Sequence, residues 1–292
     1  MTPPGRNDLG KEKSMRVNGY EMAYIECGEG EPLLLVHGSL SDYRVWSFQM
    51  RPFSRYYRTI AVSLRHFYPE QWNGEGDDFS LRQHVNDLHE FVRLLDVGPV
   101  HLMAHSRGGD VGLVFAAEYP RLVRSVVLID PAPLDVMLPK TPDVMKEVEK
   151  RKVVVSQAID RMMRGDIDGG LEMFIDTVSV PGNWKRLPEP VKQMRRENAW
   201  SLKCLASDAQ EPIDCAAVRA IDAPVLFVTA EKSPAFYGMM IAALQPYLEQ
   251  QRKITISNAS HGMFIEQPAA FNAAVLDFFA GIRSDPNELQ GC

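Results

Sequence analysis

The sequence contains few cysteines, and none of them are spaced to hold a metal ion. Its four cysteines are widely separated and include no C-x-x-C pair, which is typical of reduced thiols in a cytoplasmic protein. No apolar run is long enough to cross a bilayer, and no glycine-rich loop has the G-x-G-x-x-G spacing that binds phosphates. Residues 1–14 are polar and lack the apolar segment of a signal peptide. The sequence therefore predicts a soluble, cytoplasmic protein without a metal or a cofactor.

The sequence also lacks an excess of positive charge, with 32 lysines and arginines against 38 acidic residues. The net charge of the 292 residues is −6 and no basic cluster is present, which argues against a protein that binds nucleic acid. Hydrophobic residues make up 45% of the chain and charged residues 24%, as in one large globular domain with an insertion. We expect a small-molecule substrate as the partner, with neither nucleic acid nor a membrane. No pattern in the sequence specifies an oligomeric state.

Apolar strands alternate with amphipathic helices through the first half of the chain. Apolar residues recur at helical spacing from Leu81 to Leu95, and the strand predicted at 125–130 contains four consecutive apolar residues, 126–129, before Asp130. Strands buried on both faces read in this way. The alternation predicts an α/β fold with a mostly parallel, doubly wound sheet. The predicted strands are 22–25, 32–36, 59–62, 100–104, 125–130, 223–229 and 253–257.

One segment combines a strand, a serine and small neighbours. The apolar residues 100–104 lead directly to Ser106, and helix-like sequence follows. A serine at such a tight turn takes a strained backbone conformation, and the residues two before and two after it must be small. Ala104 and Gly108 satisfy that requirement. The segment resembles the nucleophile elbow of the α/β-hydrolase family, G-x-S-x-G, with alanine in place of the first glycine.

The resemblance extends over most of Tyr20 to Ile282 and implies an α/β-hydrolase fold. Between residues 134 and 219 the chain shows helix-like runs at 143–163, 170–178 and 191–205 and no strand, and in the family this position holds a helical cap. We therefore expect a core of residues 15–133 and 220–285, a cap at 134–219, and tails at 1–14 and 286–292.

A serine hydroxyl needs a base within hydrogen-bonding reach. His261 lies in a loop between a strand and the last helix, as does the family's late histidine, and imidazole accepts protons near neutral pH. We expect His261 to be that base. His84 and His89 are predicted to be solvated, off the apolar stripe of their helix.

The acid is less clearly specified. The family usually carries an aspartate in the turn after the penultimate strand, where this chain has Ser233. Two carboxylates could replace it. Asp130 ends the strand after the elbow, a position that supplies the acid in some relatives, and Glu231 begins the loop that normally holds it. We favour Asp130 over Glu231 and keep both open.

Backbone N–H groups stabilise the oxyanion that develops on a substrate carbonyl. Residues 36–39 (Val-His-Gly-Ser) resemble the family's H-G-x loop, which implies an oxyanion hole formed by the N–H groups of Ser39 and Arg107. The Arg107 side chain either covers the elbow or attracts an anionic substrate. We expect the loop of residues 72–78 to border the substrate entrance.

Together these features predict a serine hydrolase that cleaves a carboxylic ester or a related acyl bond through an acyl-enzyme on Ser106. Hydrolysis of a carbon–carbon bond or a lactone by the same residues remains an alternative, as does a cofactor-free dioxygenase that uses a histidine with Asp130. A third possibility is a receptor or scaffold that keeps the pocket and binds a ligand without catalysis.

Overall fold

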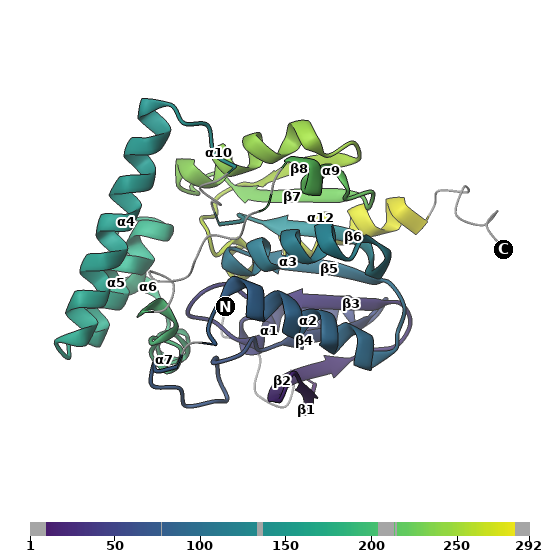
Figure 1. The fold of residues 1–292 in the computed structure, drawn as a ribbon, viewed down its shortest axis with the longest axis horizontal. Coiled ribbons are helices and arrows are strands. Elements are labelled where there is room, and N and C mark those ends of the chain that lie inside the picture. Colours follow the sequence, from purple (N-terminus) through teal and green to yellow (C-terminus); the bar gives the residue numbers. More distant parts are fainter. Residues whose placement is uncertain (1–9, 77, 133–136, 204–212, 214, 284–292) are drawn as a thin grey trace.

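The computed structural model of the chain describes residues 10–76, 78–132, 137–203, 213 and 215–283, and within them one eight-stranded sheet crosses the molecule (Figure 1). The spatial order of its strands is β1-β2-β4-β3-β5-β6-β7-β8. Their bounds are β1 (Lys11–Val17), β2 (Tyr20–Cys27), β3 (Pro32–Val36), β4 (Arg58–Val62), β5 (Val100–His105), β6 (Val123–Ile129), β7 (Val225–Ala230) and β8 (Gln251–Ile256).

The sheet is mostly parallel, as predicted. Strands β4, β3, β5, β6, β7 and β8 run in one direction, and β1 and β2 pair antiparallel at one edge. Every residue of β3 and β5 is buried because helices cover both faces of the sheet. The prediction of an α/β, doubly wound fold is thus confirmed.

The first strand is a correction to the expected tail. Lys11 to Ser14 belong to β1, which pairs with β2 from Lys11–Glu26 to Val17–Tyr20. The sequence pattern does not reveal β1, because it is an edge strand whose side chains are polar and largely exposed.

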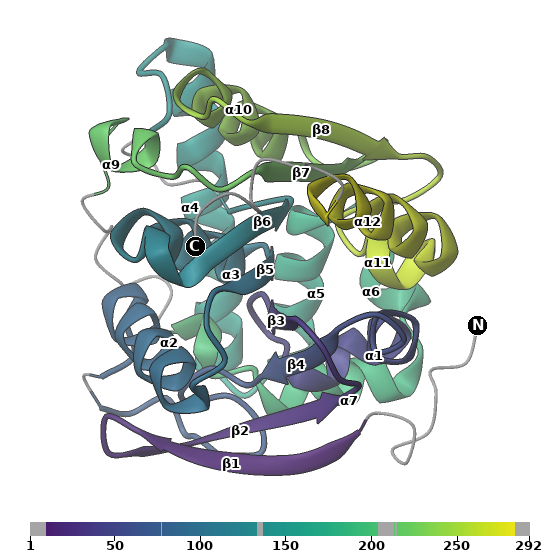
Figure 2. The same ribbon diagram turned by 90° about the vertical axis from the view of Figure 1, so that its right-hand side faces the viewer.

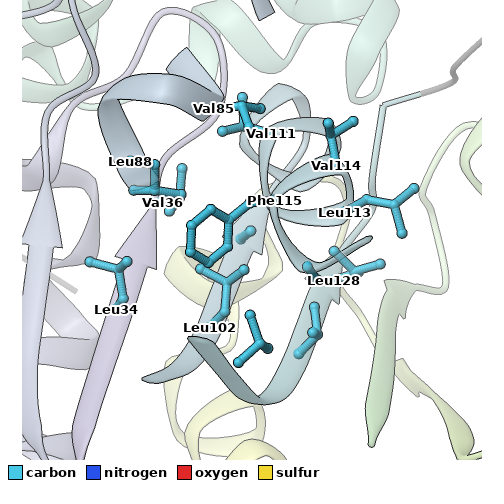
Figure 3. Packing of buried hydrophobic residues seen from close by; sticks show 14 of the residues in the cluster. Leu34, Val36, Val85, Leu88, Leu102, Val111, Leu113, Val114, Phe115 and Leu128 are labelled. Atoms are coloured by element: carbon cyan, nitrogen blue, oxygen red, sulfur yellow. The ribbon is translucent and has the colours of Figure 1, made fainter. Parts of the chain in front are cut away.

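Two layers of helices enclose the sheet (Figure 2). Strand residues alternate between them: Leu34 and Leu102 pack toward α2 and α3, whereas Leu35 and Met103 pack toward α1, α11 and α12. Figure 3 shows the first layer, with Phe115 fully buried against the sheet. The bounds are α1 (Ser47–Phe53), α2 (Leu81–Leu95), α3 (Arg107–Glu118), α9 (Cys215–Arg219), α10 (Ala235–Leu244), α11 (Met263–Glu266) and α12 (Pro268–Arg283).

A helical segment separates β6 from β7 in the chain and stands to one side of the sheet (left in Figure 1). It contains α4 (Pro142–Met163), α5 (Ile167–Val178), α6 (Asn183–Arg186) and α7 (Glu189–Glu197). These helices share a small core that includes Leu171, Trp184 and Leu202, and Leu40 from the loop after β3 packs into it. The expected helix 191–205 is interrupted, since α7 ends at Glu197 and a turn follows. Among the described residues, no helix has the length and apolar character of a membrane span.

Candidate active site

Ser106 lies at a strained turn between β5 and α3. Its φ and ψ are 54° and −124°, a conformation that residues other than glycine rarely adopt. Close packing holds this turn in place: a Cβ added to Gly108 would lie 2.3 Å from the carbonyl oxygen of His37. Ser106 is half-buried.

The structure brings His261 next to Asp130 and leaves Glu231 apart from both. Nδ1 of His261 lies 3.2 Å from Oδ2 of Asp130, whereas the exposed Glu231 accepts a 2.8 Å hydrogen bond from the backbone N–H of Asn258. Of the two carboxylates that the sequence offers, only Asp130 contacts the imidazole.

Asp130 is fully buried and is held by two hydroxyl groups. Thr229 donates to Oδ1 at 2.7 Å, and Ser233 donates to Oδ2 at 2.5 Å. Burial raises the pKa of Asp130 to about 6, although these two hydrogen bonds oppose the shift. Its backbone, like that of Ser106, has a positive φ, here 38°. Strain of this kind collects at functional sites.

The loop that carries His261 is fixed by its neighbours. Glu266 accepts hydrogen bonds from both the N–H and the hydroxyl of Ser260, and Ser179, which follows α5, bonds the same hydroxyl at 2.8 Å. The ring of His105 packs against His261 with centroids 4.4 Å apart. No motif in the sequence pointed to His105 as a site residue.

Tyr237, on α10, is a site residue that the sequence did not reveal. Its hydroxyl lies 3.0 Å from Nε2 of His261, and its ring stacks on the imidazole with centroids 4.3 Å apart. Ser106 is close enough to the same hydroxyl to lower the pKa of Tyr237, against the larger effect of burial. Within the described residues, no hydrogen bond joins Ser106 directly to His261, whose Nε2 faces Tyr237.

The protonation states follow from burial. Burial, and after it the positive charge of Arg195, lowers the pKa of His261 to about 3. Burial raises the pKa of Tyr237 well above its usual value of about 10. At neutral pH the imidazole is therefore uncharged and the phenol is protonated. With Nδ1–H directed at Asp130, Nε2 accepts the proton of the Tyr237 hydroxyl.

The loop after β3 packs directly against the nucleophile. A Cβ added to Gly38 would lie 2.9 Å from the Cβ of Ser106, so the next residue, Ser39, lies close to the elbow. His37 is buried and accepts a 3.0 Å hydrogen bond from the N–H of Leu64, which fixes the loop. Arg107 is the first residue of α3, where backbone N–H groups point out of the helix end.

The Arg107 side chain is buried beneath the loop that precedes α2. Its guanidinium lies 5.1 Å from the ring of Phe79, and Nη2 lies 3.4 Å from Nδ1 of His84. His84 is thus fully buried, which corrects the expectation that it is solvated: the loop covers the face of α2 next to the apolar stripe. His89 is half-buried and stacks on Tyr119.

The aromatic loop of residues 72–78 touches the helical segment, where the structure describes it. Nζ of Lys203 donates to the carbonyl oxygen of Gly74 at 3.1 Å, and Trp72 stacks on His66 with centroids 4.4 Å apart. Residue 77 lies outside the described residues.

A mostly parallel sheet with a serine at the turn between an inner strand and its helix defines a class of α/β enzymes. The match to the α/β-hydrolase family model extends over residues 33–274, and the chain belongs to that family. It is 25% identical over 287 residues to ethanol acetyltransferase 1 of Eremothecium cymbalariae, covering 87% of this chain and 75% of that protein.

Two solved structures share the fold. A membrane phospholipase A, a bacterial virulence factor, superposes with a TM-score of 0.75 at 23% identity. The match covers 96% of this chain and 89% of the phospholipase chain. A thermophilic esterase from Thermogutta terrifontis gives a TM-score of 0.72 at 21% identity. The match covers 94% of this chain and 99% of the esterase chain. Family and fold together indicate a hydrolase.

Proposed function

We propose that this hydrolase cleaves a carboxylic ester, or a related acyl bond, of a small molecule through an acyl-enzyme on Ser106. The observation that carries the proposal is the buried contact between Asp130 and His261, whose Nε2 contacts the hydroxyl of Tyr237 near Ser106. A neutral imidazole oriented by a carboxylate is the base that a serine nucleophile requires.

In the proposed reaction, Ser106 attacks the substrate carbonyl and its proton passes to His261. Asp130 stabilises the imidazolium that forms. The N–H groups of Ser39 and Arg107 stabilise the oxyanion, a role supported by the packing of Gly38 against Ser106. His261 then protonates the leaving group, and a water molecule that it activates releases the acid.

The same residues could also transfer the acyl group to an acceptor other than water, or cleave a bond other than an ester. The name of the Eremothecium cymbalariae relative describes transfer of an acetyl group to ethanol, and an alcohol can take the place of water in resolving an acyl-enzyme. Hydrolysis of a lactone or of a carbon–carbon bond needs the same nucleophile and base. A non-catalytic receptor would bind a ligand at these residues without turnover.

A panel of p-nitrophenyl esters with increasing acyl chain length tests the proposal. We expect release of p-nitrophenol by the wild type, with a burst equal to the enzyme concentration where deacylation is slow, and loss of at least about 10³-fold in kcat for Ser106→Ala. Turnover that survives this substitution would refute the acyl-enzyme. Added ethanol, followed by product analysis, separates hydrolysis from acyl transfer.

A further inference from the structure

Arg195, on α7, is a cationic side chain that the proposed hydrolysis does not use. Its Nη1 donates a 2.9 Å hydrogen bond to the carbonyl oxygen of Leu40 and a second bond to the hydroxyl of Ser41. Both residues follow Ser39 directly in the loop that packs against Ser106. The helical segment thus places a guanidinium beside the loop that we propose as the oxyanion hole.

No carboxylate among the described residues forms an ion pair with Arg195. The residues that it bonds are neutral, and its Nε is buried without a hydrogen-bond partner in the described part of the chain. Burial lowers the pKa of Arg195 to about 10, only partly opposed by the charge of Asp42, so the side chain stays cationic at neutral pH. A buried cation that lacks a counter-ion is costly unless an anion joins it.

Asp42 is the nearby acid, and other groups already occupy its oxygens. Arg44 donates to Oδ1 and Oδ2 at 2.8 and 2.7 Å, and Asn198 donates to Oδ2 at 2.7 Å. Arg44 also pairs with Glu197 at 2.6 Å. This network leaves the charge of Arg195 available to a ligand.

The field of Arg195 reaches the catalytic centre. After burial, which is the larger cause, its charge lowers the pKa of His37 and of His261. A ligand that reaches both Ser106 and Arg195 would meet the proposed nucleophile and a positive charge that has no ion-pair partner among the described residues.

We propose that Arg195 binds a carboxylate carried by the substrate, so that the enzyme acts preferentially on anionic esters. Guanidinium and carboxylate match each other in charge and in planar, two-pronged geometry. This assignment rests on the proposed hydrolysis at Ser106 and adds the substrate class to it.

The test compares anionic esters with neutral isosteres that differ only in a carboxamide. Monoethyl fumarate against ethyl fumaramate places the charge on the acyl side, and 3-acetoxybenzoate against 3-acetoxybenzamide places it on the alcohol side. For at least one pair, we expect kcat/KM of the wild type to favour the anion by about 10- to 100-fold, as one charge-assisted contact allows. Arg195→Gln should abolish this preference by slowing the anionic ester alone, and Arg195→Lys should retain part of it.

Arg196→Gln is the matched control. Arg196 is the next residue of α7, and its substitution removes the same charge, but its guanidinium pairs with Asp168 and Glu189. This variant should keep the wild-type preference. Equal rates on both members of both pairs would overturn the proposal, and so would an equal loss on neutral and anionic esters in Arg195→Gln, because that result would mean that Arg195 only supports the loop.

Binding separates this inference from the proposed function. Calorimetric titration with fumarate and benzoate needs no turnover, and we expect at least one of them to bind the wild type and Arg196→Gln but not Arg195→Gln. Anion binding without any ester turnover would refute the hydrolysis alone. Turnover of neutral esters without anion binding would refute the role of Arg195 alone.

Discussion

The hydroxyl of Ser233 donates a 2.5 Å hydrogen bond to Oδ2 of Asp130. Ser233 stands where the resembling family usually carries its aspartate, in the turn after β7, and Asp130 follows the neighbouring strand β6. The turn after β7 therefore still reaches the site, but it supplies a hydrogen-bond donor while the adjacent strand supplies the charge.

Substituting the two candidate acids should separate them clearly. We expect Asp130→Asn to lower kcat by about 10³- to 10⁴-fold, because an amide cannot stabilise the imidazolium that forms on His261. Glu231→Gln should stay within about twofold of the wild type, since the exposed Glu231 only accepts a bond from the backbone N–H of Asn258, in the loop after β8, and a glutamine oxygen can accept the same bond. Ester kinetics measure both, and the opposite ranking would transfer the acid role to Glu231.

The activity should fall on the acid side of neutrality. Asp130, with its pKa raised to about 6, is ionised above that pH and protonated below it. A neutral Asp130 does not stabilise the imidazolium, so kcat/KM should decrease as the pH falls through about 6. His261, with its pKa lowered to about 3, loses its base form only at much lower pH. A pH–rate profile that stays flat down to pH 4 would contradict this assignment.

Ser233→Ala should shift the pH at which the activity falls on the acid side of the pH–rate profile. The hydrogen bond from Ser233 lowers the pKa of Asp130. Loss of this bond should therefore raise the pKa of Asp130 and shift the fall in activity to higher pH. We expect the variant to lose several-fold more activity at pH 6 than at pH 8, relative to the wild type. An equal loss at both pH values would mean that Ser233 acts only on the packing of the turn.

Tyr237→Phe tests whether the phenol takes part in proton transfer. Its hydroxyl lies 3.0 Å from Nε2 of His261 and is close enough to Ser106 for the serine to affect its pKa, so we expect a proton leaving Ser106 to reach the base through it. We expect kcat to fall by about 10²-fold with little change in KM. The rate of the wild type should also depend non-linearly on the fraction of D₂O in the solvent, because two protons would move in the same step. Unchanged or faster turnover in the variant would show that the hydroxyl merely competes with Ser106 for Nε2.

Gly108 should be intolerant of even a methyl group. In Gly108→Ala the new Cβ would meet the carbonyl oxygen of His37 at 2.3 Å, so the elbow or the loop after β3 must shift. We expect a loss of about 1–3 kcal/mol in unfolding free energy, measured by urea denaturation, together with reduced activity. Gly281→Ala is the matched control: nothing lies within 4 Å of its added Cβ, and it should leave activity unchanged.

The sheet and the elbow could be predicted because their signals are local. Strands such as β3 and β5 are apolar along their whole length, and the small residues beside Ser106 satisfy a steric demand that is visible in the sequence. The late position of His261 was equally readable. The edge strand β1 was not, since its exposed face carries the charged residues of an ordinary tail.

Tyr237 and Arg195 could not be predicted because their positions depend on tertiary packing. Each lies on a helix whose own sequence gives no sign of the neighbour that it meets: Tyr237 meets His261, and Arg195 meets the loop after β3. The prediction that His84 is solvated was wrong for a related reason. His84 lies beside the apolar stripe of α2, and a loop from elsewhere in the chain covers this histidine.

The short distance between Ser233 and Asp130 has an evolutionary consequence. Asp130 Oδ2 contacts both the Ser233 hydroxyl and the imidazole, so the turns that follow two adjacent strands meet at this one oxygen. A reciprocal exchange of aspartate and serine at these two positions would carry the negative charge from one strand to the next while leaving the histidine where it is. Divergence within the fold can thus relocate an essential group by two substitutions, without rebuilding the sheet around it.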